Sequence, residues 1–139
     1  MKNVVISIKG TQQGVDDEKN TIEMETDGHY SYEDGTARID YMESELTGLE
    51  GTRTDIEAAA GKVTITRTGT LNSQMVFIMG EKNYFMYGTS FGAASIGLDT
   101  KTVKTDFDGT GGSLYIKYSL DSDSRIISRN DLQIQIREV

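Results

Sequence analysis

The chain has 139 residues, of which 36 % are hydrophobic and 26 % charged, a composition typical of a globular domain and not of a disordered segment. Its formal net charge of −8 disfavours nucleic acid and anionic membrane surfaces as main partners, because both select a basic protein surface. The absence of cysteine excludes disulfides, thiolate catalysis and zinc–thiolate sites.

Alternation of apolar and polar residues predicts a run of β-strands in the first half of the chain, because successive side chains of a strand point to opposite faces. The clearest alternation puts Ile22, Met24 and Tyr30 on one side, and acidic residues together with His29 on the other. Gly28 lies within this segment and indicates a bend or a bulge. The predicted strands cover residues 4–12, 21–32, 37–45, 52–59 and 62–70, with an acidic loop at residues 16–20.

The second half continues the pattern, with glycine-containing turns between the strands. Residues 73–79 are apolar on both faces, which suits a strand that is covered on two sides or whose outer face meets a partner. The glycine-rich residues 108–112 give the strongest hairpin-loop signal in the chain. The remaining predicted strands cover residues 84–89, 91–100, 101–107, 113–120, 126–128 and 132–139, with a bulge or turn at residues 130–131.

The order of these elements predicts an all-β fold. No segment carries a helical apolar stripe over about ten residues or more. Turn signals recur about every 8–12 residues, the spacing of an antiparallel sandwich or barrel. We therefore expect one domain over residues 1–139, an antiparallel meander of about eight to ten strands that closes into a barrel and so removes its exposed strand edges.

Two charged residues are expected to face the interior of this barrel. Arg67 shares a face with Val63 and Ile65 in one predicted strand, and Glu43 shares a face with Tyr41 in another. Burying an unpaired ion costs several kcal/mol, so the two side chains are predicted to form a bidentate ion pair. The pair is either structural, buried or at a strand end that reaches water, or it forms the polar floor of a ligand pocket.

Other arrangements of reactive residues do not support an enzyme. His29 is the only histidine, it lies on the acidic side of its strand, and the chain has no G-x-S-x-G nucleophile motif. An EF-hand loop that starts at Asp106 would have Lys117 in place of its bidentate glutamate. The glycines of residues 109–112 lack the helix and the lysine of a phosphate-binding P-loop. We predict no catalytic residue, no metal site and no cofactor.

The start of the chain predicts a cytoplasmic protein. Only three consecutive apolar residues precede Ser7, which is too short for the apolar core of a signal peptide. No later run approaches the roughly 20 apolar residues of a membrane span. The absence of cysteine fits a reducing compartment.

Several segments resemble one known family over nearly the whole chain. They are NVVISIKGTQ (3–12), YMESELTGLEGTRT (41–54), ITRTGTLNSQMVF (65–77), YGTSFG (87–92) and SLYIKYSLD (113–121). Together they resemble the YwiB-like proteins of Firmicutes, small bacterial proteins with a lipocalin-like, calycin-type antiparallel barrel. The resemblance implies the same barrel here, and no catalytic residue can be carried over from the family. Relatives often carry proline after the threonine that matches Thr89, whereas this chain has Ser90.

The first functional hypothesis is a non-enzymatic binder of a small molecule or a fatty-acyl-like ligand, because a barrel of about eight strands can enclose one small ligand. The residues predicted to line its interior site are Tyr41, Glu43, Arg67, Ser73, Met75, Phe77 and Tyr87. The alternative is a protein–protein interaction module or a homodimer, which the apolar residues 76–79 favour. An enzyme is the weakest hypothesis, and neither nucleic acid nor membrane is expected as a partner.

Overall fold

A computed structural model describes residues 1–14, 19–89 and 92–139 and confirms the predicted all-β fold. Within these ranges it has ten strands and no helix, and therefore no helix that could cross a membrane. The strands are β1 (Lys2–Gly14), β2 (Lys19–Glu33), β3 (Thr36–Met42), β4 (Arg53–Ala59), β5 (Lys62–Thr68), β6 (Ser73–Ile78), β7 (Lys82–Thr89), β8 (Gly92–Asp108), β9 (Gly111–Ser122) and β10 (Arg125–Glu138). Residues 16–18 of the predicted acidic loop, Ser90 and Phe91 lie outside the described ranges.

Two pairs of predicted strands are in fact single long strands. Residues 91–100 and 101–107 were predicted separately, but β8 runs through them with a register shift between Thr100 and Thr102. Residues 126–128 and 132–139 form β10, whose irregularity lies between Ile126 and Ser128 and not at residues 130–131. A bulge adds one residue and bends a strand without ending it, so local polar sequence is a poor guide to strand ends here.

The ten strands form one antiparallel sheet in the order β6-β5-β4-β3-β2-β1-β10-β9-β8-β7. The ladder between β1 and β10 joins the two ends of the chain, so the barrel is open between β6 and β7 instead. Across this seam the Asn83 side chain on β7 donates a hydrogen bond of 2.8 Å to the Val76 carbonyl on β6. Closure is therefore nearly but not fully achieved, and β6 and β7 keep the strand edges that full closure would remove.

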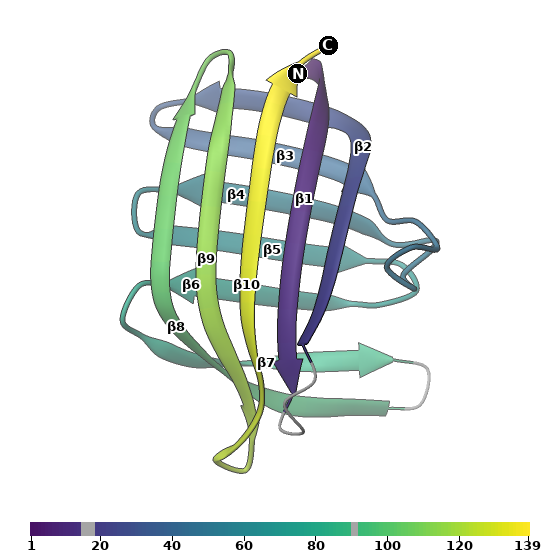
Figure 1. The fold of residues 1–139 in the computed structure, drawn as a ribbon, viewed down its shortest axis with the longest axis vertical. Helices are drawn as coiled ribbons and strands as arrows, with labels where there is room; N and C mark the ends of the chain where they lie inside the picture. Colours follow the sequence, from purple (N-terminus) through teal and green to yellow (C-terminus); the bar gives the residue numbers. More distant parts are fainter. Residues whose placement is uncertain (15–18, 90–91) are drawn as a thin grey trace.

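The strands lie in two layers that enclose the core. Figure 1 shows β1, β2, β8, β9 and β10 along the long axis, with β3 to β6 crossing behind them. Strand β2 pairs with β1 up to Tyr30 and with β3 from His29 onward, so it passes from one layer to the other at this point. A Cβ atom at Gly28 would collide with the Asp40 carbonyl oxygen and the Ile6 side chain. The glycine that indicated a bend is thus required where the layers approach closely.

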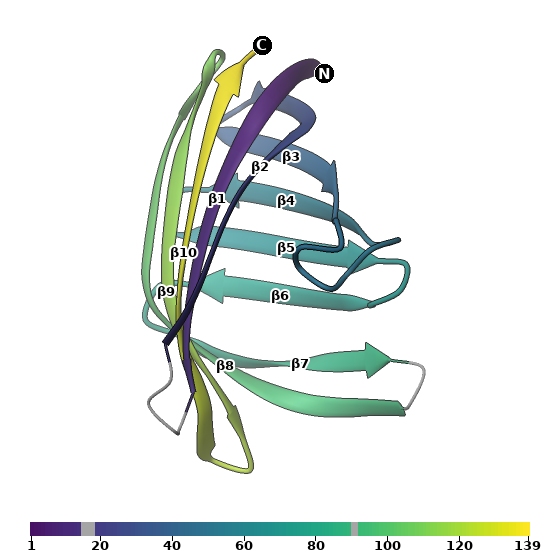
Figure 2. The ribbon, with the colours of Figure 1, turned by 45° about the vertical axis from the view of Figure 1, so that its right-hand side comes forward.

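The hairpin of β7 and β8 leaves this two-layer arrangement. Residues 92–96 of β8 pair with β7 alone, and β8 joins β9 only from Gly97 onward. Figure 2 shows β7 and the first part of β8 extending sideways below β6. At the base of the hairpin Lys82 and Asp121 form an ion pair of 2.8 Å, and a Cβ at Gly97 would collide with the Asp121 carboxylate. The base of the hairpin is therefore fixed to β9.

Inward-facing residues of all ten strands form a single core. Tyr30 closes one end of it, because its hydroxyl donates a 2.6 Å hydrogen bond to the Asp108 carbonyl in the β8–β9 turn, and burial raises the pKa of Tyr30 to about 12. Phe77 meets Tyr118 edge to face with 4.8 Å between ring centroids. The buried apolar residues are Val4, Ile6, Tyr30, Ala37, Ile39, Tyr41, Ile56, Ala58, Val63, Ile65, Met75, Phe77, Phe85, Leu98, Val103, Leu114, Ile116, Ile134 and Ile136.

Candidate functional site

A cavity of about 140 Å³ lies between the two layers of the barrel. It is bounded by β1, β2 and β10 on one side, by β3, β4 and β5 on the other, and by the connection between β3 and β4. Most of its wall is aliphatic, with a few polar groups in one region. The lining residues are Ile8, Gly10, Ile22, Met24, Tyr41, Glu43, Thr47, Leu49, Ile56, Ile65, Arg67, Leu132 and Ile134.

Glu43 is the most deeply buried charged group of this site, with 2 % of its side chain exposed. It lies one residue beyond β3, where its backbone N–H still donates to the Thr52 carbonyl at 2.8 Å and so extends the pairing with β4. Its carboxylate accepts hydrogen bonds from the Thr54 hydroxyl at 2.7 Å and from the Thr47 hydroxyl at 3.0 Å. These two donors offset part of the cost of removing the carboxylate from water.

Arg67 faces the same cavity from β5, as the alternation with Val63 and Ile65 predicted. Its Nε atom lies 3.8 Å from Glu43 Oε1, within ion-pair range but beyond hydrogen-bonding distance. The predicted bidentate contact is therefore wrong, because Glu43 is held toward the two threonine hydroxyls instead. The buried Arg67 Nε–H has no hydrogen-bond partner among the described residues, although the nearby Nη1 lies 4.0 Å from Met75 Sδ.

Two phenol groups near this pair stay protonated at neutral pH. Burial raises the pKa of Tyr41 above its usual range, and the Glu43 carboxylate adds to the shift. Burial also raises the pKa of Tyr118, although the Arg67 guanidinium opposes it. The polar part of the cavity thus combines the Glu43 carboxylate, the Arg67 guanidinium and the neutral phenol of Tyr41, while Tyr118 lies outside its lining.

The other residues predicted to line the site are not at the cavity. Ser73, Met75 and Phe77 are buried on β6, where they pack in the core. Tyr87 lies on β7 and is 42 % exposed, so its predicted interior position is wrong, because the hairpin that carries it leaves the barrel. The sequence prediction also missed apolar lining residues from β2, β10 and the β3–β4 connection, namely Ile22, Met24, Leu49 and Leu132. Alternation alone could have found those on β2 and β10.

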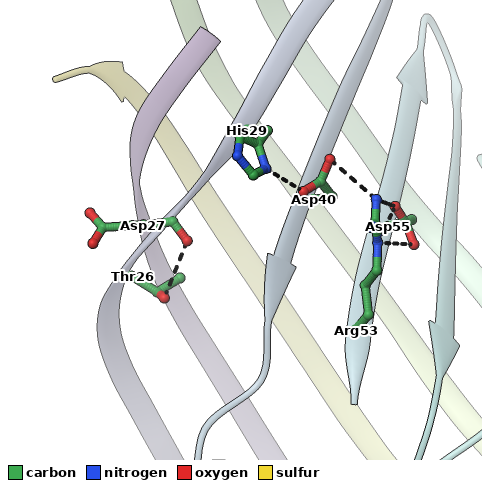
Figure 3. Close-up of polar contacts among 6 residues, drawn as sticks. All are labelled: Thr26, Asp27, His29, Asp40, Arg53 and Asp55. Atoms are coloured by element: carbon green, nitrogen blue, oxygen red, sulfur yellow. Dashed lines mark hydrogen bonds and ion pairs between the residues drawn. The ribbon is translucent and has the colours of Figure 1, made fainter. Parts of the chain in front are cut away.

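His29 belongs to a polar chain on the outside of the barrel. Its Nδ1 atom lies 2.8 Å from Asp40 Oδ1, and Arg53 joins Asp40 at 3.5 Å and Asp55 at 3.1 Å (Figure 3). These residues lie on β2, β3 and β4, so the chain links three adjacent strands across their outer face. The predicted solvent-facing position of His29 is confirmed. No group of His, Asp and Glu able to hold a metal occurs in the described part of the chain.

The glycine-rich turn between β8 and β9 is explained by packing. A Cβ at Gly111 would collide with the Ile136 carbonyl oxygen, and one at Gly112 with the Asp106 carbonyl oxygen. Both glycines also have positive φ angles, of 142° and 149°. The turn therefore needs glycine to fit against β10 and β8, and this packing explains the glycines without a bound phosphate.

A nearly closed barrel of ten antiparallel strands, with a small cavity and the buried Glu43 carboxylate inside, defines this molecule as a small β-barrel protein. Residues 6–134 match the family described as a domain of unknown function, DUF1934, and the chain belongs to this family. The uncharacterized β-barrel protein YwiB of Bacillus subtilis is 26 % identical over 105 residues, which cover 76 % of this chain and 72 % of YwiB.

The fold comparison agrees with this assignment. The crystal structure of the ywiB protein from Bacillus subtilis matches with a TM-score of 0.87 at 21 % identity, over 99 % of this chain and 92 % of that one. The predicted YwiB-like family and the predicted barrel are both confirmed.

Proposed function

We propose that the protein binds a small, mainly apolar molecule with one hydrogen-bond acceptor in the interior cavity. The observation that carries this proposal is the buried Arg67 Nε–H, which has no hydrogen-bond partner among the described residues and lies at a largely aliphatic cavity. A buried donor without a partner costs about 1–3 kcal/mol. An acceptor on a bound ligand would remove this cost, while the aliphatic wall takes up the rest of the molecule.

The size and charge of the cavity narrow the class of ligand. Its volume of about 140 Å³ is close to the roughly 150 Å³ of an apolar protein cavity that holds benzene. A ring or a short branched chain fits this space, whereas a complete fatty-acyl chain does not. Because Glu43 already balances the Arg67 charge, a neutral carbonyl or hydroxyl suits the site better than a second carboxylate.

A titration with cyclohexanone tests this proposal, with methylcyclohexane and cyclohexanecarboxylate as comparison ligands. We expect cyclohexanone to raise the melting temperature most and to shift the methyl NMR signals of Ile8, Ile56 and Ile65, because ligands that bind only the folded state stabilise it. Arg67→Met keeps the apolar bulk but loses the donor, so it should abolish the preference for the ketone. Met42→Ala, on the outer face of β3, should leave it unchanged. If none of the three compounds shifts the cavity methyl signals, the proposal is wrong.

A homodimer formed through β7 is a second candidate function. Strand β7 is the last strand of the sheet, and Tyr84 and Met86 on it are 66 % and 57 % exposed. Edge strands with exposed apolar side chains readily pair with another strand, and an antiparallel β7–β7 pair would have two-fold symmetry. The apolar outer face predicted at residues 76–79 consists of Val76 and Ile78 on β6, which are half-buried, and of Met79 just beyond the strand, which is 51 % exposed.

Sedimentation equilibrium at low micromolar concentration tests the dimer. We expect the unmodified chain to dimerise and Met86→Lys to be monomeric, because a charge at the centre of the edge opposes pairing. Met42→Lys, an exposed methionine on β3, is the matched control and should still dimerise. A monomeric unmodified chain would contradict the proposal.

A further inference from the structure

Four basic side chains surround a second hollow, which is separate from the interior cavity. It lies on the outer face of the layer formed by β1, β2, β8, β9 and β10. The hollow has a volume of about 180 Å³ and is lined by Lys19, Lys101, Lys117 and Arg129, with Asp131 as the one acidic group among the described residues that line it. This gathering of positive charge is unexpected in a chain whose formal net charge is −8.

The register of the sheet brings the four cations together from four different strands. Gln13 on β1 pairs with Lys19 on β2 and with Arg129 on β10, so these two cations lie on either side of β1. Lys117 on β9 pairs with Asp131, two residues along β10 from Arg129. Figure 1 shows β2, β1, β10, β9 and β8 side by side, and neighbouring strands are about 4.8 Å apart. The register therefore places the four cations close together on one face of these strands.

The bulge in β8 supplies the fourth cation. Lys101 is the extra residue between Thr100, which pairs with Tyr118, and Thr102, which pairs with Lys117. Thr100 is fully buried, whereas Lys101 is exposed and Thr102 partly exposed beside Lys117. A bulge redirects side chains and is enriched next to functional sites. Here it adds a lysine to the rim of the hollow.

Few acidic groups of the described residues compensate the charges in this hollow. Seven of the 14 lysines and arginines form no ion pair with any described residue, and four of those seven are the cations of this hollow. The carboxylate of Asp131 accepts a hydrogen bond of 3.2 Å from the Tyr115 hydroxyl. Among the described residues, the hollow thus presents several charged N–H donors and a single carboxylate.

We propose that this hollow binds a compact oxyanion, the diphosphate group of a small soluble molecule. Charge-assisted hydrogen bonds from guanidinium and ammonium groups to phosphate oxygens are strong, and several cations on adjacent strands can contact one diphosphate at once. The hollow has the size of such a group and not of an extended polymer. The negative charge of the rest of the protein repels a long polyanion such as nucleic acid.

Calorimetric titration with inorganic pyrophosphate at constant ionic strength tests this proposal. We expect saturable binding to the unmodified chain, and binding weakened about tenfold or more in Arg129→Gln and Lys117→Gln, because each loses a charge-assisted contact. The matched controls are Arg125→Gln, on the same strand as Arg129, and Lys62→Gln in the other layer, and both should bind as the unmodified chain does. Unchanged melting temperatures establish that all four variants are folded.

Three results would overturn the proposal. The first is the absence of saturable pyrophosphate binding by the unmodified chain. The second is an equal loss in all four variants, which would mean that pyrophosphate responds only to overall charge. The third is binding to phosphatidylserine vesicles without binding to pyrophosphate, which would assign the surface to a membrane and not to a soluble phosphate compound.

Discussion

Replacing Phe77 by alanine is expected to lower the free energy of unfolding by about 3–5 kcal/mol, the range for removing a large aromatic side chain from a core. Phe77 has no exposed surface, lies opposite Val63 on β5 and stacks edge to face on Tyr118 from the other layer. The alanine variant would lose this contact between layers and leave a void. Urea unfolding followed by circular dichroism measures the change.

The control for Phe77 is Met42→Ala, since Met42 is 56 % exposed on β3. Its loss should stay within about 0.5 kcal/mol, as for most surface substitutions. If Phe77→Ala cost no more than this control, β6 would not be packed against the opposite layer, and the space inside the barrel would be larger than the cavity at Arg67.

Replacing Arg67 by alanine is expected to lower the free energy of unfolding by roughly 3 kcal/mol, the lower end of the range for breaking a buried ion pair. The lower end applies because 23 % of the Arg67 side chain is exposed, and because Glu43 keeps its hydrogen bonds from Thr47 and Thr54. Arg67→Met should cost clearly less, since methionine refills the space that alanine leaves empty. Thermal and urea unfolding at neutral pH measure both values.

A double-mutant cycle separates the charge interaction between Arg67 and Glu43 from the packing of the two side chains. Glu43→Gln combined with Arg67→Met should be less destabilised than the sum of the two single variants if the charges interact in the folded state. Equal and negligible losses for Arg67→Ala and Arg67→Met would contradict an inward position of the guanidinium. In that case the interior site would lack its donor and the proposed ligand binding would lose its basis.

The interior position of Arg67 and Glu43 could be predicted because it depends only on local alternation. Each residue shares parity with buried apolar neighbours, and the period of two holds along β5 and for one residue beyond β3. The distance between the two side chains could not be predicted in the same way. It depends on how Thr47 and Thr54 position the carboxylate, which involves the irregular connection between β3 and β4.

The exposed position of Tyr87 could not be predicted from the alternation of its strand. Its strand alternates as a barrel strand does, but residues 92–96 of β8 pair with β7 alone, outside the two layers. Whether a hairpin stays within the barrel depends on strand lengths and on contacts at its base, such as Lys82 with Asp121. The position of the seam also could not be predicted from local patterns. It follows from the pairing of β1 with β10, the first and the last strand in the sequence.

The pairing of the first strand with the last one has a consequence for protein engineering. The two ends of the chain lie side by side (Figure 1), while the seam falls at the turn between β6 and β7. A circular permutant with a short linker between the present ends and new ends in this turn would run from β7 through β10 and β1 to β6. In that chain every strand would be bonded to the next one in sequence, and the longest-range ladder of the barrel would become a simple hairpin.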